Sequence, residues 1–419
     1  MAPSHPDHGR SVLRCCHGDV SCLSRFRKEL STSDEIKITK KTQPQPPRGS
    51  HLDWFTLSPE GFSVIRVGLV GFGLAGRVFH APLLASVPGY ELVSVVERTA
   101  NQAETRYPGI RTLRTLDEIL ADASLHLIVI ATPSNTHYSF AIQALHAGKH
   151  VVIDKPMAMR SGEIVEILAR AAQRKLLAVP FQNRRWDSDF LTLSKVVKEG
   201  SLGRIVSLES RMDRWTPGAP RVPWKNDPSQ GGMLYDLGTH LVDQALVLFG
   251  KPLGVSAEVE RERDWDGPAE EAPNDSFTIR LRYPGLFVTL GCNLLTAVPS
   301  FRYSLRGTKG GFRKHGADPQ EPALGKITHI ASPAWGHEPM HDWGVKHIDL
   351  DGGIDTETVE SCPGDYRQFY IQLREAIINS APPPATATEA WRIARILEWS
   401  AQSSAERREI ECDWSAEPA

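Results

Sequence analysis

Three side chains far apart in the sequence, Lys155, Asp236 and His240, have types suited to moving a proton to or from a substrate oxygen. Asp236 and His240 lie in GGMLYDLGTHLVDQALVLFG, Gly231 to Gly250, which we predict to be a single helix. Four positions make about one helical turn, so the two side chains share a face, on which Asp243 continues the polar stripe. A carboxylate one turn from an imidazole can orient the ring and stabilise its charged form for general acid–base catalysis. From these residues alone, a histidine hydrogen-bonded within a domain interface remains an alternative.

Gly238 and Lys155 indicate where a ligand would lie. A glycine inside a helix costs about 1 kcal/mol relative to alanine, so we expect Gly238 to let a ligand approach closely. Lys155 follows an apolar run in the tetrapeptide IDKP. Open parallel sheets bind ligands at the carboxyl ends of their strands, so the Lys155 ammonium is placed to reach a substrate oxygen. A surface lysine ahead of a helix is the alternative for this tetrapeptide alone.

The stretch VIRVGLVGFGLAGRVFHAPLL, Val64 to Leu84, has the spacing GxGxxG of a phosphate-binding turn. It follows an apolar strand and opens a helix, where glycines permit a tight turn and close approach of the backbone to a pyrophosphate. The helix N-terminus then offers N–H donors to the phosphates. The residues expected to contact the cofactor here are Gly71, Gly73, Leu74, Ala75 and Gly76. A glycine turn used only for packing is the alternative.

The segment VVERTANQ, Val95 to Gln102, gives mixed signals about which dinucleotide would bind. Glu97 lies 21 residues beyond Gly76, where an acid accepts hydrogen bonds from the ribose hydroxyls of NAD. Arg98 and Thr99 follow at once, and a guanidinium can grip the 2′-phosphate of NADP. We expect Glu97 to be exposed and able to turn toward solvent, which favours NADP, with NAD as the alternative.

The elements that must position these residues show two different patterns of apolar and polar residues along the sequence. From residue 63 to about 185, short apolar strands alternate with helices, which predicts a doubly wound parallel sheet, a Rossmann dinucleotide-binding domain. From 186 to 412 longer runs alternate apolar and polar residues, as in DSFTIRLRY, where Phe277, Ile279 and Leu281 share one face. This pattern predicts an α+β domain with a large, mostly antiparallel, open-faced sheet that ends in two helices. Residues 1–62 lack periodicity, and we predict a disordered extension.

Composition limits the possible partners. The chain has 419 residues, a formal net charge of -2 and six cysteines. This charge creates no field that would gather nucleic acid or anionic lipid, so we predict a small-molecule ligand and neither a nucleic-acid nor a membrane partner. Sparse cysteines fit a reducing compartment, and we expect a cytoplasmic protein. We predict no metal site, because the adjacent cysteines of CCHGDVSC have poor geometry for two tetrahedral ligands.

Four motifs in order, GFGLAGRVFHAPLL, HVVIDKPMA, FQNRRWDSDFLTL and YDLGTHLVDQ, resemble the Gfo/Idh/MocA oxidoreductases over about residues 64 to 410. The similarity is to the branch that contains NADP-dependent scyllo-inositol dehydrogenases. The resemblance implies a Rossmann domain followed by a sheet whose open face covers the nicotinamide. It matches the family's EKP motif to Asp154, Lys155 and Pro156, with aspartate in place of the glutamate. Its catalytic DxGxH matches Asp236, Gly238 and His240, which assigns Lys155, Asp236 and His240 to one catalytic site.

The resemblance also implies further contacts. Thr132, Pro133 and His137 match a TPxxxH segment that touches the cofactor, and Asn183, Arg184 and Trp186 fall where the family places substrate and nicotinamide contacts. Asp236 and His240 are expected to touch the substrate as well. Arg185 belongs to the same stretch, and it could equally form a salt bridge between the two domains instead of a ligand contact.

These expectations define an NAD(P)-dependent dehydrogenase that passes hydride between the nicotinamide and a carbinol or carbonyl carbon of a polyol or sugar, either inositol-like or an aldose. His240, oriented by Asp236, or Lys155 would take the hydroxyl proton. A non-catalytic dinucleotide-binding regulator of the same fold is the alternative. The resemblance and an apolar open sheet face favour a homo-oligomer.

Overall fold

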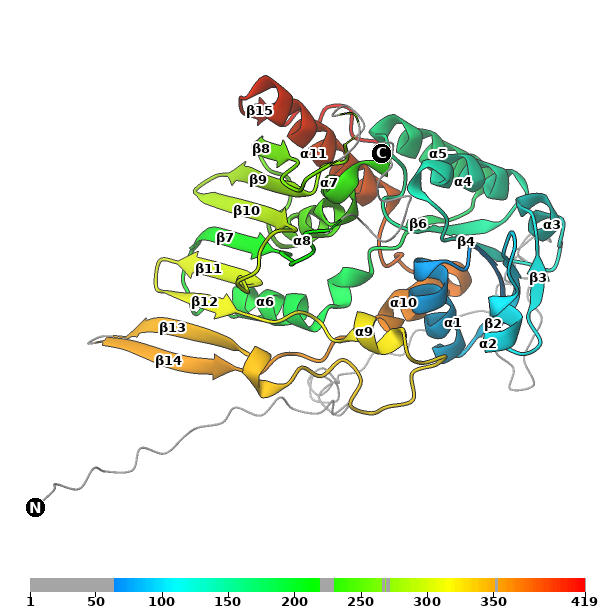
Figure 1. Cartoon of the computed structure of the whole chain (residues 1–419), viewed down its shortest axis with the longest axis horizontal. Helices are drawn as coiled ribbons and strands as arrows, with labels where there is room; N and C mark the ends of the chain where they lie inside the picture. The colour runs from blue at the N-terminus through cyan, green and yellow to red at the C-terminus, as the bar shows by residue number, and fades with distance from the viewer. Residues whose placement is uncertain (1–63, 219–229, 266–267, 269–271, 351–352, 419) are drawn as a thin grey trace, which may run out of the picture. The chain divides into compact units, whose positions relative to one another are not determined.

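The computed structural model describes residues 64–218, 230–265, 268, 272–350 and 353–418. The predicted extension 1–62 and the CCHGDVSC cluster lie outside the described residues. The described part contains two sheets, one of six strands in the order β3-β2-β1-β4-β5-β6 and one of nine in the order β14-β13-β12-β11-β7-β10-β9-β8-β15 (Figure 1). The predicted fold class, a Rossmann sheet followed by a mostly antiparallel sheet, is confirmed.

All pairings in the six-stranded sheet are parallel. The strands β1, β4 and β5 are almost entirely buried, since helices cover both faces, and they therefore appear in the sequence as continuous apolar runs. The six strands are β1 (Ile65–Val70), β2 (Tyr90–Val96), β3 (Arg111–Leu113), β4 (Leu127–Ile130), β5 (His150–Ile153) and β6 (Ala178–Pro180).

Short helical segments connect these strands. They are η3 (Gly76–His80, a π-helix), α1 (Ala81–Ser86), α2 (Gln102–Arg106), α3 (Leu116–Leu120), η4 (Ser134–Thr136), α4 (His137–His146) and α5 (Ser161–Arg174). In α5, Ile164, Ile167 and Ala171 recur at helical spacing and are buried against the sheet. The sequence did not predict α2 and β3, because elements of five and three residues are too short to show a hydrophobic period.

The nine-stranded sheet is antiparallel except where β10 runs parallel to β7. Its strands are β7 (Ile205–Arg211), β8 (Gly254–Glu260), β9 (Ser276–Tyr283), β10 (Leu286–Asn293), β11 (Tyr303–Gly307), β12 (Gly310–Lys314), β13 (Gly344–Leu350), β14 (Gly353–Val359) and β15 (Ile410–Glu411). In β9, Phe277, Ile279 and Leu281 are buried on one face as predicted, and they pack in a core with the helices on that side.

The helices of the second half close this core and also reach the six-stranded sheet. They are η5 (Asn183–Trp186), α6 (Ser188–Glu199), α7 (Gly232–Asp236), α8 (Gly238–Phe249), α9 (Gln320–Leu324), η9 (Met340–Asp342), α10 (Arg367–Asn379) and α11 (Ala387–Glu406). In Figure 1, α10 lies beside α1, and its Phe369, Tyr370 and Leu373 share a core with β1 and β4. Thus the last two helices, although distant in sequence, help to cover the parallel sheet.

The outer face of the nine-stranded sheet is polar. On β9 it carries Thr278 and Arg280, both exposed, and half-buried Arg282. Phe287 of β10 is exposed on the same face, but the Arg280 guanidinium lies over its ring. The expectation of an apolar open face is therefore wrong, because the residues that alternate with the buried ones are charged or hydroxylated. An assembly of several subunits stays a prediction that rests on the resemblance alone.

None of the helices in the described segments combines the length and the apolar character needed to cross a lipid bilayer.

Candidate active site

A cavity of about 720 Å³ lies where the carboxyl ends of the parallel strands face α7, α8 and α9. Residues from the glycine-rich loop, the ends of β2, β4 and β5, the η5 turn and α7–α8 all line it. Of the sequence-predicted residues, the cavity brings together Gly71, Gly73, Leu74, Ala75, Glu97, Arg98, Thr132, Pro133, Lys155, Asn183, Arg184, Asp236 and His240. It does not bring in Gly76, His137 or Trp186, which have other roles.

The glycine-rich loop has the backbone that a phosphate-binding turn needs. Gly71 has φ of +97°, and a Cβ there would come within 2.5 Å of the Ala131 carbonyl oxygen. A Cβ on Gly73 would meet nothing within 4 Å, so the backbone there borders open space. A Cβ on Gly76 would collide with the Gly71 carbonyl, so this glycine closes the turn against itself rather than contacting a ligand.

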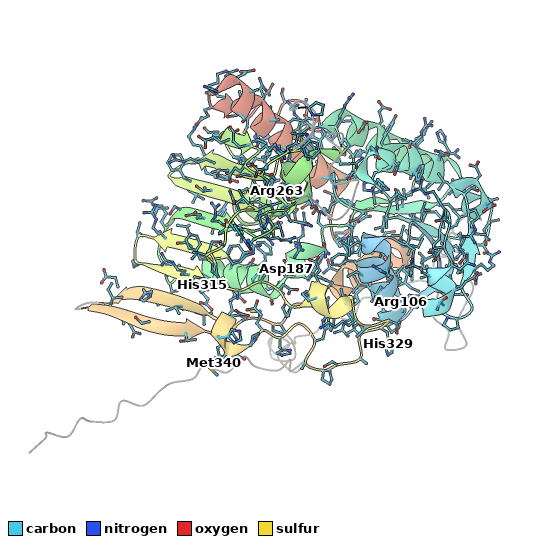
Figure 2. The ribbon with its side chains drawn as sticks, in the orientation of Figure 1. Arg106, Asp187, Arg263, His315, His329 and Met340 are labelled. Carbon is cyan, nitrogen blue, oxygen red and sulfur yellow. The ribbon has the colours of Figure 1, made fainter. Side chains whose placement is uncertain are left out.

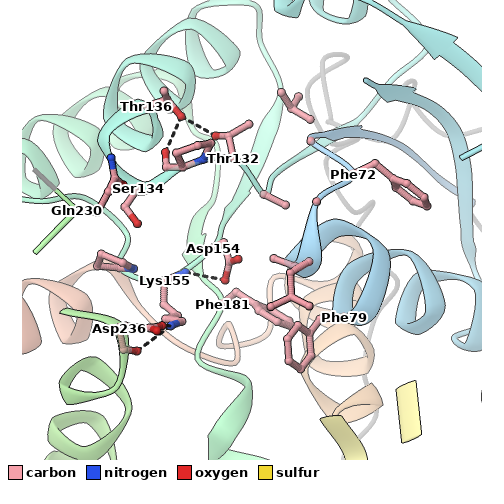
Figure 3. Close-up of a pocket in the computed structure, with 18 of the residues that line it drawn as sticks. Phe72, Phe79, Thr132, Ser134, Thr136, Asp154, Lys155, Phe181, Gln230 and Asp236 are labelled. Atoms are coloured by element: carbon pink, nitrogen blue, oxygen red, sulfur yellow. Dashed lines mark hydrogen bonds and ion pairs between the residues drawn. The ribbon is translucent and has the colours of Figure 1, made fainter. Parts of the chain in front are cut away.

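Lys155 and Asp236 form an ion pair across the cavity. Lys155 Nζ lies 2.5 Å from Asp236 Oδ1 and 2.7 Å from the Asp236 carbonyl oxygen, and the two side chains are only 18% and 20% exposed. Figure 3 shows the lysine directed at this carboxylate, beside Asp154, whose Oδ1 accepts the Lys155 backbone N–H. The carboxylate that the sequence analysis paired with His240 therefore binds the lysine. The two residues meet because the carboxyl end of β5, which precedes Lys155, faces the end of α7, which carries Asp236.

His240 is buried beside this pair. Burial lowers the pKa of its imidazole well below the usual value, and the positive charges of Lys155 and Arg184 lower it further. Its Nδ1 is buried without a hydrogen-bond partner. The ring is therefore neutral near neutral pH and can accept a proton. No hydrogen bond joins Asp236 to the ring in the described part of the chain, so the predicted orientation of His240 by Asp236 is not supported.

The predicted single helix from 231 to 250 is two helices. α7 ends at Asp236 and α8 begins at Gly238, with Leu237 between them. The break also changes the account of Gly238, because a Cβ there would meet Leu397 Cδ2 at 3.2 Å and a Phe277 ring carbon at 3.5 Å. Core packing against α11 and β9, and not a ligand, explains the absence of a side chain at this position.

The segment after β4 contributes two of its three predicted contacts. Thr132 and Pro133 line the cavity, where the hydroxyls of Thr132 and Thr136 are 2.6 Å apart (Figure 3). His137 is buried outside it, with Nδ1 2.7 Å from the Pro156 carbonyl and Nε2 2.9 Å from the Thr132 carbonyl. The prediction that His137 touches the cofactor is therefore not supported, since its Nδ1 contacts the loop that carries Lys155 and its Nε2 contacts Thr132 of its own segment.

Two of the four residues of the η5 turn line the cavity, and the other two make contacts elsewhere in the protein. Asn183 and Arg184 line the cavity, and the Arg184 guanidinium is held by Asp187 at 3.2 Å and Glu321 at 2.5 Å. Asp187 lies in the interior (Figure 2), where burial raises the pKa of its carboxyl well above the usual value despite the opposing charge of Arg184.

The other two residues of this turn do not reach the cavity. Trp186 packs edge-on against Phe369 at 6.2 Å, so its predicted substrate contact is not supported. Arg185 bonds both carboxylate oxygens of Asp243 and lies 3.2 Å from Glu389, which is the salt bridge given as its alternative.

The end of the cavity at β2 contains residues that the sequence reasoning missed. Arg114 and Thr115 line it beside Arg98 and Thr99. Glu97 is only 7% exposed, and its Oε1 accepts the Ala103 backbone N–H at 2.6 Å. The expectation of an exposed, movable glutamate is therefore wrong, because the first turn of α2 binds its carboxylate.

A signal for Arg114 existed in the sequence. It directly follows the short strand β3, and strand carboxyl ends border the ligand site, but β3 was not recognised. Ser134, Thr136 and Tyr235 also line the cavity and were missed, although they lie within segments that contain predicted contacts. Three further missed residues, Arg214, Gln230 and Glu321, lie in loops or short elements without any pattern that predicts their position.

Comparison with known proteins agrees with this geometry. Residues 65–181 match the Gfo/Idh/MocA model described as an oxidoreductase family NAD-binding Rossmann fold, and residues 194–412 match its C-terminal alpha/beta domain. The scyllo-inositol 2-dehydrogenase (NADP(+)) IolW of Bacillus subtilis is 35% identical over 348 residues, 83% of this chain and 95% of that protein.

Two further matches span most of the chain. The uncharacterized oxidoreductase YdgJ of Escherichia coli is 35% identical over 344 residues, 82% of this chain and 97% of that protein. A solved structure of the Bacillus subtilis protein YvaA, described as an oxidoreductase, has a TM-score of 0.79 and 33% identity, and the match covers 84% of this chain and 100% of that one.

Proposed function

Because the chain belongs to the Gfo/Idh/MocA family of oxidoreductases, we propose that it is a dehydrogenase that interconverts a carbinol and a carbonyl group of a polyol or sugar with a nicotinamide dinucleotide. One observation carries this proposal: the Lys155–Asp236 pair and His240 line the same cavity as the glycine-rich loop. The name of the relative IolW, a scyllo-inositol dehydrogenase, supports a polyol substrate.

The residues present fit a dinucleotide. The positive φ of Gly71 and the open space beside Gly73 allow a pyrophosphate to approach the backbone, and the helical turn after them supplies N–H donors. Arg98 and Thr132 line the same cavity as this loop. When bound, the nicotinamide ring supplies the hydride acceptor or donor. We propose residues 63–185 as the dinucleotide-binding domain and 186–412 as the substrate domain.

The chain's own residues would handle the proton and the substrate oxygen. The neutral imidazole of His240 can accept the hydroxyl proton, while the Lys155 ammonium, held by Asp236, stabilises negative charge on that oxygen. Asp236 keeps the lysine in place through the 2.5 Å contact and so acts on the reaction through it. We therefore assign His240 as the base in the oxidation direction and Lys155 as the electrostatic group.

The part of the cavity near Lys155 and His240 carries both hydrogen-bond donors and hydrogen-bond acceptors. Asn183 and Arg184 offer donors, and Glu321 and Asp236 offer acceptors, around the same space. Such a mixture suits several adjacent hydroxyl groups better than a single charge. This supports a polyol or sugar as the substrate class.

We propose NADP as the preferred cofactor. The Glu97 carboxylate is tied to α2 through Oε1, and the exposed Arg98 lines the cavity beside it, where its guanidinium can meet a phosphate. The relative IolW is named for NADP, which agrees.

Turnover tests the proposal directly. Purified protein is mixed with NADP or NAD and a panel of inositols and aldoses, and nicotinamide absorbance is followed with wild type and Lys155→Ala. We expect turnover that requires Lys155 and is faster with NADP. Binding of dinucleotide without turnover of any panel member, equal in both proteins, would instead indicate the non-catalytic regulator.

A further inference from the structure

We infer that Arg214, on the wall of the cavity, binds a carboxylate group of the substrate, so that the chain acts on a sugar acid in preference to a neutral polyol or sugar. The inference rests on the proposed function and narrows its substrate class. The hydroxyl groups of the substrate would meet the donors and acceptors around Asn183 and Arg184, and its one anionic group would meet Arg214. The carboxylate holds the substrate in place and is itself unchanged by the oxidation of the carbinol.

The backbone of Arg214 is fixed just beyond the end of β7. Its N–H donates to the Asn293 carbonyl at 2.8 Å, and its carbonyl accepts the Thr296 N–H at 3.1 Å. The N–H groups of Met212 and Thr216, on either side of it, donate to backbone carbonyls of the same partner segment. The guanidinium therefore borders the cavity from a backbone that is held in register and not from a loosely attached loop.

The guanidinium of Arg214 has no acidic partner among the residues that the structure describes. Its side chain is exposed and forms no ion pair or hydrogen bond with any of them. The adjacent acid, Asp213, is nearly buried, and its two carboxylate oxygens accept from Arg211 at 2.6 Å and 3.1 Å. This neighbouring carboxylate is therefore already used by another guanidinium.

The acids that line the same part of the cavity are bonded as well. Asp236 is held by Lys155 (Figure 3), and Glu321 is held by Arg184. Asp154 Oδ1 accepts the backbone N–H of the lysine at 2.8 Å. Each cation of these two ion pairs is matched by a carboxylate of the protein, so the remaining guanidinium is the one whose charge a ligand can match.

The buried thiol of Cys292 places Arg214 at the Asp236 end of the cavity. Burial raises the pKa of this thiol to about 12; the charge of Arg214 lowers it and that of Asp236 raises it. Both groups therefore lie within electrostatic range of one side chain. Because Asp236 also holds Lys155, the guanidinium belongs to the end of the cavity with the proposed proton-transfer groups, away from Arg98 at the end of β2.

A carboxylate fits this guanidinium better than the alternatives. A dinucleotide and a sugar that fill the cavity displace water from its wall, and a charged group that loses water needs an opposite charge. A planar carboxylate matches a single guanidinium with two parallel hydrogen bonds, which a neutral hydroxyl does not. A phosphate monoester carries about two negative charges at neutral pH, and one guanidinium would match only part of that charge.

Two matched pairs of sugars test the inference: glucuronate against glucose, and galacturonate against galactose. In each pair a carboxylate replaces a hydroxymethyl group. Nicotinamide absorbance with NADP gives kcat/KM for the full chain as wild type, R214Q and the control R408Q, which alters an exposed arginine in an ion pair with Glu406. We expect wild type to prefer the acid by at least about tenfold, since a hydrogen bond to a charged group corresponds to about that change or more.

The variants separate Arg214 from other sources of this preference. R214Q should lower it by about tenfold or more, chiefly through KM, because the carboxylate is bound alike in the ground state and the transition state. R408Q should leave it unchanged. A wild type without the preference, or an R214Q that keeps it, overturns the inference. A higher kcat/KM for glucose 6-phosphate than for glucuronate also overturns it, in favour of a phosphate.

Binding measurements separate this site from the chemistry. Isothermal titration calorimetry follows glucuronate and glucose binding to the full chain saturated with NADPH, in which no oxidation of the sugar can follow. An Arg214-dependent preference for glucuronate in a chain that oxidises no sugar or inositol sustains the site and refutes the proposed function. Oxidation of neutral sugars or inositols without the preference refutes the site alone, and a chain that shows neither refutes both.

A second variant keeps the test decisive if R214Q does not fold by circular dichroism. R214K retains the positive charge but lacks the paired N–H donors of a guanidinium. It should lower the preference for the acid by about threefold or more, because one of the two parallel hydrogen bonds is lost. An unchanged preference in R214K then overturns the inference.

Discussion

The contact between Lys155 and Asp236 predicts a specific energetic coupling. Two double-mutant cycles are made. One pairs Lys155→Met with Asp236→Asn, and the other pairs His240→Asn with Asp236→Asn. In a double-mutant cycle the coupling free energy reports the direct interaction even where each single change alters stability by other routes.

The magnitude follows from the geometry. Lys155 Nζ donates to Asp236 Oδ1 at 2.5 Å, and both side chains are about four-fifths buried, so solvent screens the pair only weakly. A hydrogen bond between charged groups contributes about 1.5 to 3 kcal/mol. The bond from Lys155 Nζ to the Asp236 carbonyl survives the Asp236→Asn change, so we expect a coupling near the middle of this range, about 2 kcal/mol. His240 is neutral, so its coupling to Asp236 should stay below about 0.5 kcal/mol.

Urea unfolding at neutral pH, followed by tryptophan fluorescence, measures the free energy of unfolding of each variant. The assay needs no substrate, so it tests the arrangement independently of the reaction. A His240–Asp236 coupling larger than the Lys155–Asp236 coupling would refute the reasoning and restore the aspartate as the partner of the imidazole.

Three further outcomes follow from the same structure. Lys155→Ala and His240→Ala should each remove most turnover while dinucleotide binding persists, and a near wild-type kcat in either, measured by nicotinamide absorbance, would exclude that residue from the chemistry. Burial lowers the pKa of His80 from 6.5 to about 4. The buried neutral imidazole therefore contributes fully to the free energy of unfolding above pH 6.5, and this contribution is lost as the pH falls toward 4. At about 1.36 kcal/mol per pH unit this is about 3 kcal/mol. Urea titrations at several pH values should show that His80→Gln loses about this much less stability than wild type between pH 6.5 and 4. Gly238→Ala should shift the thermal midpoint, because its Cβ meets Leu397, yet leave dinucleotide affinity within about twofold by calorimetry; a large loss of affinity would return Gly238 to the ligand site.

The sequence predicted the glycine-rich loop, the order of the main elements and many of the residues that line the cavity, although Gly76, His137 and Trp186 do not line it. These features are local: a strand followed by a turn and a helix has a recognisable period, and Gly71 and Gly73 act through their own backbone. The alternation in β9 likewise placed Phe277, Ile279 and Leu281 on the buried face without any knowledge of what covers them.

The sequence could not predict which side chains bond to one another. Asp236 is four residues from His240 and 81 from Lys155, yet its carboxylate binds the lysine. Spacing along a helix gives only neighbours on that helix, and here the helix also breaks at Leu237. Partners from other elements are set by how the two sheets and their helices pack, which no local pattern contains.

Thus the amino-acid sequence by itself determined the family, the Rossmann sheet and the chemical types present in the site, because backbone conformation and hydrophobic periodicity are encoded within a few residues. Only the tertiary structure decided that Glu97 is bound by α2, that His137 links two loops outside the cavity and that Arg114 borders it. The physical reason is that each of these roles depends on a hydrogen-bond partner or an open space supplied by a separate segment. Burial then determines whether such a group remains available to a ligand.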